Sequence, residues 1–165
     1  MRKLKLDELD RISVEEFKQT EKLPVCIVLD NIRSLHNVGS AFRTSDAFKL
    51  EKVYLTGITG QPPHREIEKT ALGATASVDW EHAEKTADVL RSLKEKGYTI
   101  IAVEHTSASE SLNHFHPGEG TKYCLVFGNE VNGVSEEAIA LADKALEIPQ
   151  HGTKHSLNIS VCLGI

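Results

Sequence analysis

Short apolar runs alternate along this chain with longer segments whose apolar residues recur at helical spacing. The runs predict strands at residues 25–29, 52–55, 77–80, 98–103, 123–127 and 145–148. Continuous apolar runs of this length are typical of strands buried on both faces, as in a parallel sheet. The segments between them predict helices at 4–19, 38–48, 66–72, 86–96 and 135–141, with a last helix that begins near Ser156.

Alternating strands and helices indicate an α/β fold, with a mainly parallel sheet and helices on both faces. Ser13 with Glu16 forms a capping-box signature, and Gly97 suits the end of the helix before it. Without an internal repeat or linker, we expect one domain over 1–165, with 1–22 as a helical extension. The apolar pattern still runs at Ile165, so we expect that the last helix is cut short, whether the natural protein continues or its tail was lost.

Composition is that of an ordinary globular protein, with 40% hydrophobic and 26% charged residues in a chain of 165, enough for one core. No apolar run approaches the roughly 20 residues that span a bilayer. Residues 1–10 are charged and lack the apolar core of a secretory signal, so we expect a cytoplasmic protein. Each of the three cysteines sits in an apolar run, which favours buried thiols over disulfides or zinc ligands.

The net charge of −5 argues against a protein that binds long nucleic acids by bulk electrostatics, although local basic sites remain possible. Four basic clusters occur, each alone more often a solvated face than a site: Arg2, Lys3, Lys5 and Arg11; Arg33, His36 and Arg43; His64, Arg65 and Lys69; His151, Lys154 and His155. No cysteine or carboxylate completes a histidine pair at metal-ligand spacing, so we expect no metal.

Three polar segments follow predicted strands, where parallel sheets bind their ligands. The first motif, residues 31–44, opens a helix with Asn37 as the expected N-cap and Gly39 as a point of close backbone approach. Arg43 lies less than two helical turns after Asn37, so its guanidinium could project back over the strand end and hold a phosphate. The alternative is a surface arginine paired with Asp46 or Glu51.

The second motif, residues 126–135, is a strand-to-helix turn in which Gly128 and Gly133 flank Glu130. It lacks the spacing of a dinucleotide-binding turn and the lysine of a P-loop. Taken alone, it is equally compatible with an ordinary turn whose Glu130 is solvated.

The third motif, residues 148–161, runs from a strand end through a polar loop into an apolar helix. Ser156, Asn158 and Ser160 interrupt that helix. Polar groups on a buried helix need specific partners, which indicates a binding site. As an alternative, Ser156 is simply the N-cap.

In this order and spacing, the three motifs resemble the signature motifs of the SpoU (TrmH-like) RNA 2′-O-ribose methyltransferases of the SPOUT superfamily. The resemblance runs from about Leu23 to the end of the chain, and a loop at 69–74 also resembles a recurring family segment. Gln150 is a departure, because the family usually has Met there. The matching residues are Asn31, Asn37, Gly39 and Arg43; Gly128, Glu130 and Gly133; and Ile148, Pro149, Gly152, Ser156, Leu157 and Asn158.

The resemblance implies a C-terminal trefoil knot that forms a pocket for S-adenosyl-L-methionine, and a homodimer to which the last helix contributes. It also implies that the cofactor is held around Val103, Gly128, Ile148, Ser156 and Leu157. In such a dimer, the arginine of one subunit faces the cofactor of the other.

The catalytic residues implied by the resemblance are Arg43, Asn37, Glu130, Ser156 and Asn158. Arg43 either removes the proton from the ribose hydroxyl or positions a phosphate, and both roles stay open because a guanidinium rarely gives up its proton. Asn37 would orient Arg43 or the ribose, Glu130 would fix the second motif, and Ser156 and Asn158 would bond the substrate. No metal is required.

The expected substrate is RNA, with tRNA favoured over rRNA because so compact a chain has no additional RNA-binding domain. A catalytically inactive, knotted RNA-binding module is the main alternative. Such a module would bind neither S-adenosylmethionine nor S-adenosylhomocysteine. A small α/β nucleotide-binding protein is a second alternative, against which the missing phosphate-binding patterns count.

Overall fold

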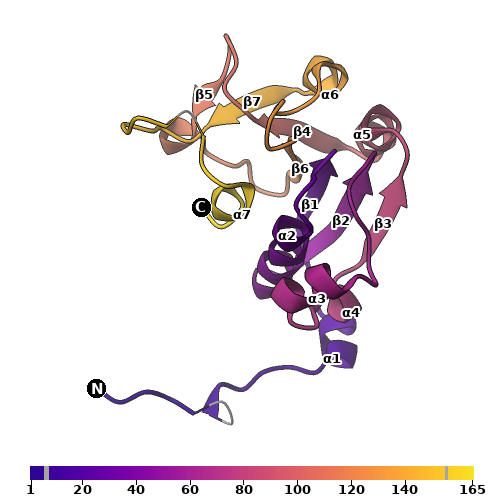
Figure 1. Cartoon of the computed structure of the whole chain (residues 1–165), viewed down its shortest axis with the longest axis vertical. Coiled ribbons are helices and arrows are strands. Elements are labelled where there is room, and N and C mark those ends of the chain that lie inside the picture. The colour runs from indigo at the N-terminus through magenta and orange to yellow at the C-terminus, as the bar shows by residue number, and fades with distance from the viewer. Residues whose placement is uncertain (6–7, 155) are drawn as a thin grey trace.

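The computed structural model describes residues 1–5, 8–154 and 156–165. Its centre is a parallel sheet in the order β3-β2-β1-β6-β4-β7-β5 (Figure 1). The strands are β1 (Leu23–Asp30), β2 (Leu50–Thr56), β3 (Trp80–Ala83), β4 (Tyr98–Val103), β5 (Glu110–Ser111), β6 (Lys122–Phe127) and β7 (Lys144–Glu147).

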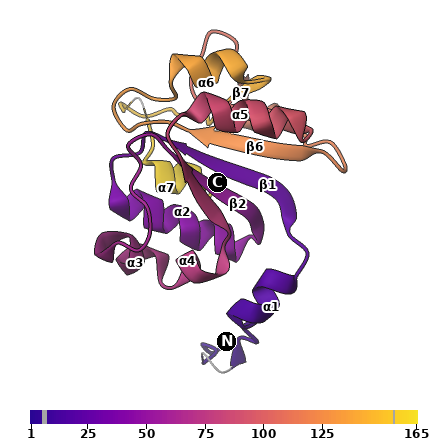
Figure 2. The same ribbon diagram turned by 90° about the vertical axis from the view of Figure 1, so that its right-hand side faces the viewer.

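Helices cover both faces of this sheet (Figure 2). One face carries α2 (Leu35–Ala47), α3 (Arg65–Ala71), α4 (Ala74–Ser77) and α7 (Ile159–Cys162). The other carries α5 (Thr86–Glu95) and α6 (Glu136–Leu141). The remaining helical elements are α1 (Val14–Gln19) and a 3₁₀ turn at Leu112–His114. The predicted α/β fold, with a parallel sheet between two helical layers, is therefore confirmed.

Strand β1 lies between β2 and β6 and supplies the core of both layers. Ile27 and Leu29 pack in the cluster that contains α2, whereas Cys26 and Val28 pack in the cluster that contains α5. Because successive side chains point to opposite faces, both sets must be apolar, and the run is continuous. Burial also raises the pKa of the Cys26 thiol to about 11, as expected of a buried, unreactive cysteine.

Two predicted helix starts are wrong. Helix α2 begins after Ser34, whose hydroxyl accepts the N–H of Asn37 at 3.2 Å, so Asn37 lies within the first turn. Helix α7 begins after Asn158, which caps it through the N–H of Ser160 at 2.8 Å, so Ser156 lies before the helix. In both helices, the N-cap is a different polar residue, which lies within three positions of the predicted one.

The strand predicted at 77–80 is also misplaced. Ser77 ends the short helix α4, and β3 begins only at Trp80. The break between α3 and α4 arises at Leu72 and Gly73, which both adopt left-handed backbone conformations. The chain therefore forms a second short helix, α4, which was not predicted from the sequence.

The N-terminal extension is anchored by one side chain. Helix α1 begins with the predicted capping box of Ser13 and Glu16, and Phe17 on its inner face is 4% exposed within the α2-side core. The ammonium of Lys22 lies 3.8 Å from the centre of the Phe17 ring. The predicted helix over 4–19 is thus present only at 14–19 among the described residues, and positions 6–7 lie outside them.

Gly39 allows helices α2 and α3 to touch. A Cβ atom at this position would overlap the hydroxyl of Thr70 and the backbone carbonyl of Ile67. The same Thr70 hydroxyl donates to the carbonyl of His36 at 2.9 Å. The close backbone approach expected at Gly39 is therefore made by a neighbouring helix.

Gly39→Ala should destabilise the domain by about 2 kcal/mol, because the added methyl group must push α3 away from α2. Urea unfolding followed by circular dichroism measures the difference. Gly152→Ala is the matched control, since a Cβ there meets nothing within 4 Å. Equal stabilities of the two variants would contradict this account of the helix contact.

Candidate active site

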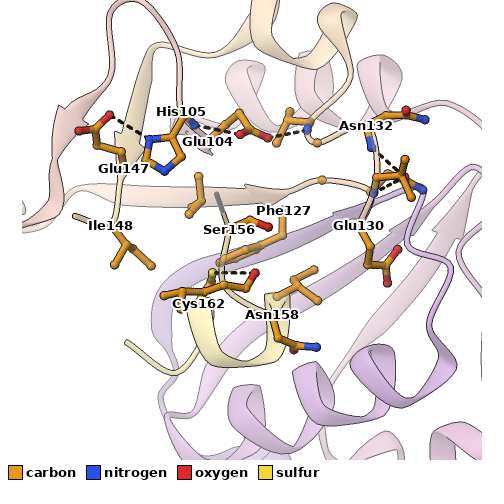
Figure 3. Close-up of a pocket in the computed structure, with 18 of the residues that line it drawn as sticks. Glu104, His105, Phe127, Glu130, Asn132, Glu147, Ile148, Ser156, Asn158 and Cys162 are labelled. Atoms are coloured by element: carbon orange, nitrogen blue, oxygen red, sulfur yellow. Dashed lines mark hydrogen bonds and ion pairs between the residues drawn. The ribbon is translucent and has the colours of Figure 1, made fainter. Parts of the chain in front are cut away.

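A pocket of about 670 Å³ lies beyond the carboxyl ends of β4, β6 and β7, with α7 on one side (Figure 3). This volume is in the range of small-molecule and cofactor sites. The pocket brings together residues of the second and third motifs that lie far apart in the sequence. Its lining comprises Val103, Glu104, His105, Phe127–Val134, Glu147, Ile148, Gln150, Ser156–Ile159 and Cys162.

The second motif is a tight turn closed by hydrogen bonds of its own. Asn129 and Gly133 exchange backbone hydrogen bonds of 2.9 and 2.8 Å, and the Asn129 side chain accepts the N–H of Val131. A Cβ atom on Gly128 would overlap the backbone at 133–134, so only glycine fits there. Gly128 is therefore required by the shape of the turn that lines the pocket.

Two carboxylates hold the end of this turn. Asp30, 1% exposed at the end of β1, accepts the backbone N–H of Ser135 at 2.8 Å and the hydroxyl of Thr86 at 2.6 Å. Glu104, directly after β4, accepts the N–H of Val134 at 3.0 Å. Sequence reasoning missed both residues, although each is an acidic residue at the end of a buried apolar run.

Glu130 connects the second motif to the first. Its carboxylate accepts the backbone N–H groups of Arg33 and Ser34 and the side-chain amide of Asn37, each at 3.0 Å. Partial burial would raise the pKa of Glu130, but these donors outweigh it and hold the pKa below its ordinary value. Glu130 is therefore a fixed element of the site, and its carboxylate faces the start of α2.

Arg43 lies apart from the pocket. It is exposed on α2 and makes no hydrogen bond or ion pair within the part of the chain that the structure describes, so the alternative pairing with Asp46 or Glu51 is absent there. The Asp46 carboxylate instead accepts the hydroxyl of Ser77. Arg43 borders a second hollow of about 790 Å³ between the N-terminal segment, α2 and α4.

The third motif forms the opposite wall of the pocket. Ser156, Leu157 and Asn158 all line it, and Ile159 anchors the following helix in the α2-side core. His155 lies outside the described residues. Thus the predicted cofactor residues share one cavity with Glu130 and Asn158, whereas Arg43 does not.

Gln150, which departs from the family pattern, belongs to a polar group on the pocket rim. Its side-chain amide lies 3.4 Å from Nε2 of His105, whose Nδ1 lies 3.3 Å from Glu147. Glu147 also accepts the hydroxyl of Ser109 at 2.6 Å. The hydrogen bond from Ser109 is the larger cause that lowers the pKa of Glu147, and the contact with His105 is the smaller one. A methionine at 150 would lack the amide contact to the histidine.

Among the described residues, no group of three or more His, Cys, Asp or Glu side chains is placed to hold a metal ion. No helix among them is both long and apolar enough to cross a membrane.

Known proteins share both the sequence and the fold of this chain. The family model described as the SpoU rRNA Methylase family matches residues 24–165. A tRNA (guanosine(18)-2′-O)-methyltransferase from Thermus thermophilus is 33% identical over 96% of this chain and 79% of its own length. A 23S rRNA (guanosine-2′-O-)-methyltransferase from Neisseria meningitidis is 31% identical over 86% of this chain and 56% of its own length.

Solved structures agree with these relatives. The TrmH/SpoU tRNA modifying enzyme of A. aeolicus superposes with a TM-score of 0.79 at 28% identity, over 92% of this chain and 75% of that one. An AdoMet-bound rRNA methyltransferase from Sinorhizobium meliloti superposes with a TM-score of 0.80 at 25% identity, over 90% and 56% of the two chains. Since the family model spans nearly the whole chain, this protein belongs to the SpoU methylase family.

Proposed function

We propose that this chain methylates a ribose 2′-hydroxyl of RNA, with S-adenosyl-L-methionine as the methyl donor. The observation that carries the proposal is the pocket in which the second and third motifs meet, with Glu130 bonded to the first motif. This chain belongs to the family and carries every residue that the resemblance assigns to catalysis. Both facts disfavour an inactive RNA-binding module.

The pocket suits the cofactor in shape and charge. Apolar side chains, Phe127, Ile148 and Leu157 among them, offer a surface for the adenine ring. The described lining residues include three glutamates and neither lysine nor arginine, which favours a cofactor with a net positive charge. Bound there, the cofactor supplies an activated methyl group on its sulfonium sulfur.

Residues of the chain then orient the hydroxyl and accept its proton. Ser156 and Asn158, on the pocket wall, bond the ribose, while Glu130 and Asn37 keep the first and second motifs in register. Arg43 either takes the hydroxyl proton or positions a neighbouring phosphate of the RNA, as its guanidinium is suited to do. The ribose oxygen would take the methyl group, and its proton would pass to Arg43 in the base role or to solvent in the positioning role.

Among RNA substrates, we favour tRNA over rRNA. The chain spans about four fifths of the Thermus tRNA enzyme but little more than half of the Neisseria rRNA enzyme.

We also propose a cytoplasmic location, which stays a prediction.

A homodimer with composite sites would bring Arg43 to a pocket. Arg43 and the pocket residues lie in separate hollows of one chain. Next to the pocket, apolar side chains are exposed on α7 and just after it, with Val161 at 49% and Ile165 at 64%. These features support a dimer in which the arginine of one subunit faces the cofactor of its partner.

The single domain and the C-terminal trefoil knot are part of the same proposal. Residues 156–159 and Cys162 line the same cavity as 103–105 and 127–134, and Ile159 packs in the core with Phe42. A last segment threaded past the residues after β4 and β6 would account for these contacts. The buried Phe17 supports 1–22 as an extension of one domain.

Arg43→Ala should reduce methyl transfer at least about 100-fold, since it removes the group that handles the proton or the phosphate. The assay uses labelled S-adenosylmethionine with separate pools of unmodified tRNA and rRNA, and digested products are analysed by mass spectrometry. Cofactor affinity should stay unchanged because Arg43 lies outside the pocket. Only the base role predicts residual activity with a shifted pH profile in Arg43→Lys. Full activity of Arg43→Ala would refute both roles.

Mixing two inactive variants should restore activity if sites are shared between subunits. Arg43→Ala keeps an intact pocket, whereas Asn158→Ser alters the pocket but keeps a side chain able to cap α7. Random exchange of subunits would give one intact site in each mixed dimer, so about a quarter of the unmutated activity should return. No recovery, with mixed dimers demonstrated by mass spectrometry, would show that each site is formed within one chain.

A further inference from the structure

Glu104 is a pocket residue to which the sequence motifs assign no role. It follows the last residue of β4, and its side chain lies on the pocket wall near the second motif (Figure 3). One carboxylate oxygen accepts the N–H of Val134 at 3.0 Å, and the other accepts the N–H of His105 at 2.9 Å. Both contacts suit an ionised carboxylate, which only accepts hydrogen bonds.

Glu104 differs from the other two glutamates of the pocket in where its carboxylate is held. Glu147 faces the imidazole of His105, and Glu130 points to the amides at the start of α2. Glu104 meets only neutral backbone donors within the described residues and forms no ion pair among them. Its negative charge therefore has no cationic partner among those residues.

The influence of this charge reaches the far side of the pocket. Burial raises the pKa of the Cys162 thiol on α7, and the charge of Glu104 raises it further. Cys162 and Glu104 both lie on the pocket lining, so a ligand bound between them would lie close to the negative charge of Glu104.

We propose that Glu104 is the specificity-determining residue by which the pocket distinguishes the cationic methyl donor from its demethylated product. The inference rests on the proposed function and concerns the same pocket. Transfer moves the methyl group to the ribose oxygen, releases the hydroxyl proton, and leaves a neutral thioether where a sulfonium stood. The product therefore carries one positive charge less than the donor and loses attraction to Glu104.

A purely structural role for Glu104 is the competing explanation. A Cβ atom on Gly133 would overlap the Glu104 carboxylate, and Val134 is bonded to it, so Glu104 also holds the second motif in place. Damage to that contact would weaken all ligands of the pocket alike. Charge recognition weakens only the cationic ones.

The test is calorimetric titration with three ligands: S-adenosylmethionine, S-adenosylhomocysteine and sinefungin, whose amine carries a positive charge near the sulfonium position. Glu104→Gln removes the charge, and Glu104→Asp keeps the charge but shortens the reach to Val134. Glu119→Gln is the control, because Glu119 is exposed and lies outside the pocket. Thermal unfolding confirms that each variant is folded.

Glu104→Gln should weaken both cationic ligands about tenfold more than the product, the scale of one charge interaction in a partly exposed site. Glu104→Asp should leave the ratio of donor to product affinity within about twofold of the unmutated protein, and Glu119→Gln should leave every affinity unchanged. An equal loss for all three ligands in Glu104→Gln, or no loss, would overturn the proposal. A tenfold change in the ratio of donor to product affinity in Glu104→Asp would also overturn it.

A second measurement needs no variant. In the unmutated protein, the affinities for the two cationic ligands should fall with rising salt while the affinity for the product stays nearly constant. Parallel salt dependence of all three ligands would overturn charge recognition. Failure of the unmutated chain to bind any of them would instead contradict the proposed function, and with it this inference.

Discussion

The site depends on one type of interaction, the hydrogen bond from a loop N–H group to a carboxylate. Asp30 and Glu104 hold the end of the second motif through Ser135 and Val134, and Glu130 extends from that motif to the start of α2. Loop amides withdrawn from water need acceptors, and charged acceptors make the stronger bonds. Three carboxylates thereby connect β1, β4, β6 and α2 around a turn that has little apolar packing of its own.

The same arrangement separates two electrostatic regions of the chain. The pocket lining carries three glutamates and neither lysine nor arginine among the described residues, whereas Arg11, Arg43 and Lys49 border the second hollow together with Asp10 and Asp46. A cationic cofactor suits the first region and a polyanionic RNA suits the second. A net charge of −5 is therefore compatible with RNA chemistry, because the positive groups need to be gathered only where the backbone of the substrate is held.

The sequence predicted the layers of the fold better than the details of the site. Buried strands such as β4 and capped helices such as α6 have strong local patterns, and both were confirmed. The starts of α2 and α7 were predicted at Asn37 and Ser156, whereas the observed caps are Ser34 and Asn158. Several nearby polar residues could cap each helix equally well, and only packing decides among them. Asp30 and Glu104 were missed because they hold the second motif through backbone amides distant in sequence, which leave no side-chain pattern. Arg43 is only six residues from Asn37, yet Asn37 bonds Glu130 of the second motif while Arg43 borders the separate second hollow, which spacing does not reveal.

The strand order has a consequence for synthesis on the ribosome. Strand β6 lies between β1 and β4, although about a hundred residues separate its sequence from that of β1. Until residue 127 has emerged, the growing chain can form only the part of the sheet from β1 to β3, and β1 presents an unpaired, strongly apolar edge. Such an edge is a template for association with other chains, and pairings between distant segments form slowly. The nascent protein is therefore most prone to aggregate in the interval between the synthesis of β1 and that of β6, and this interval is where a chaperone would help it most.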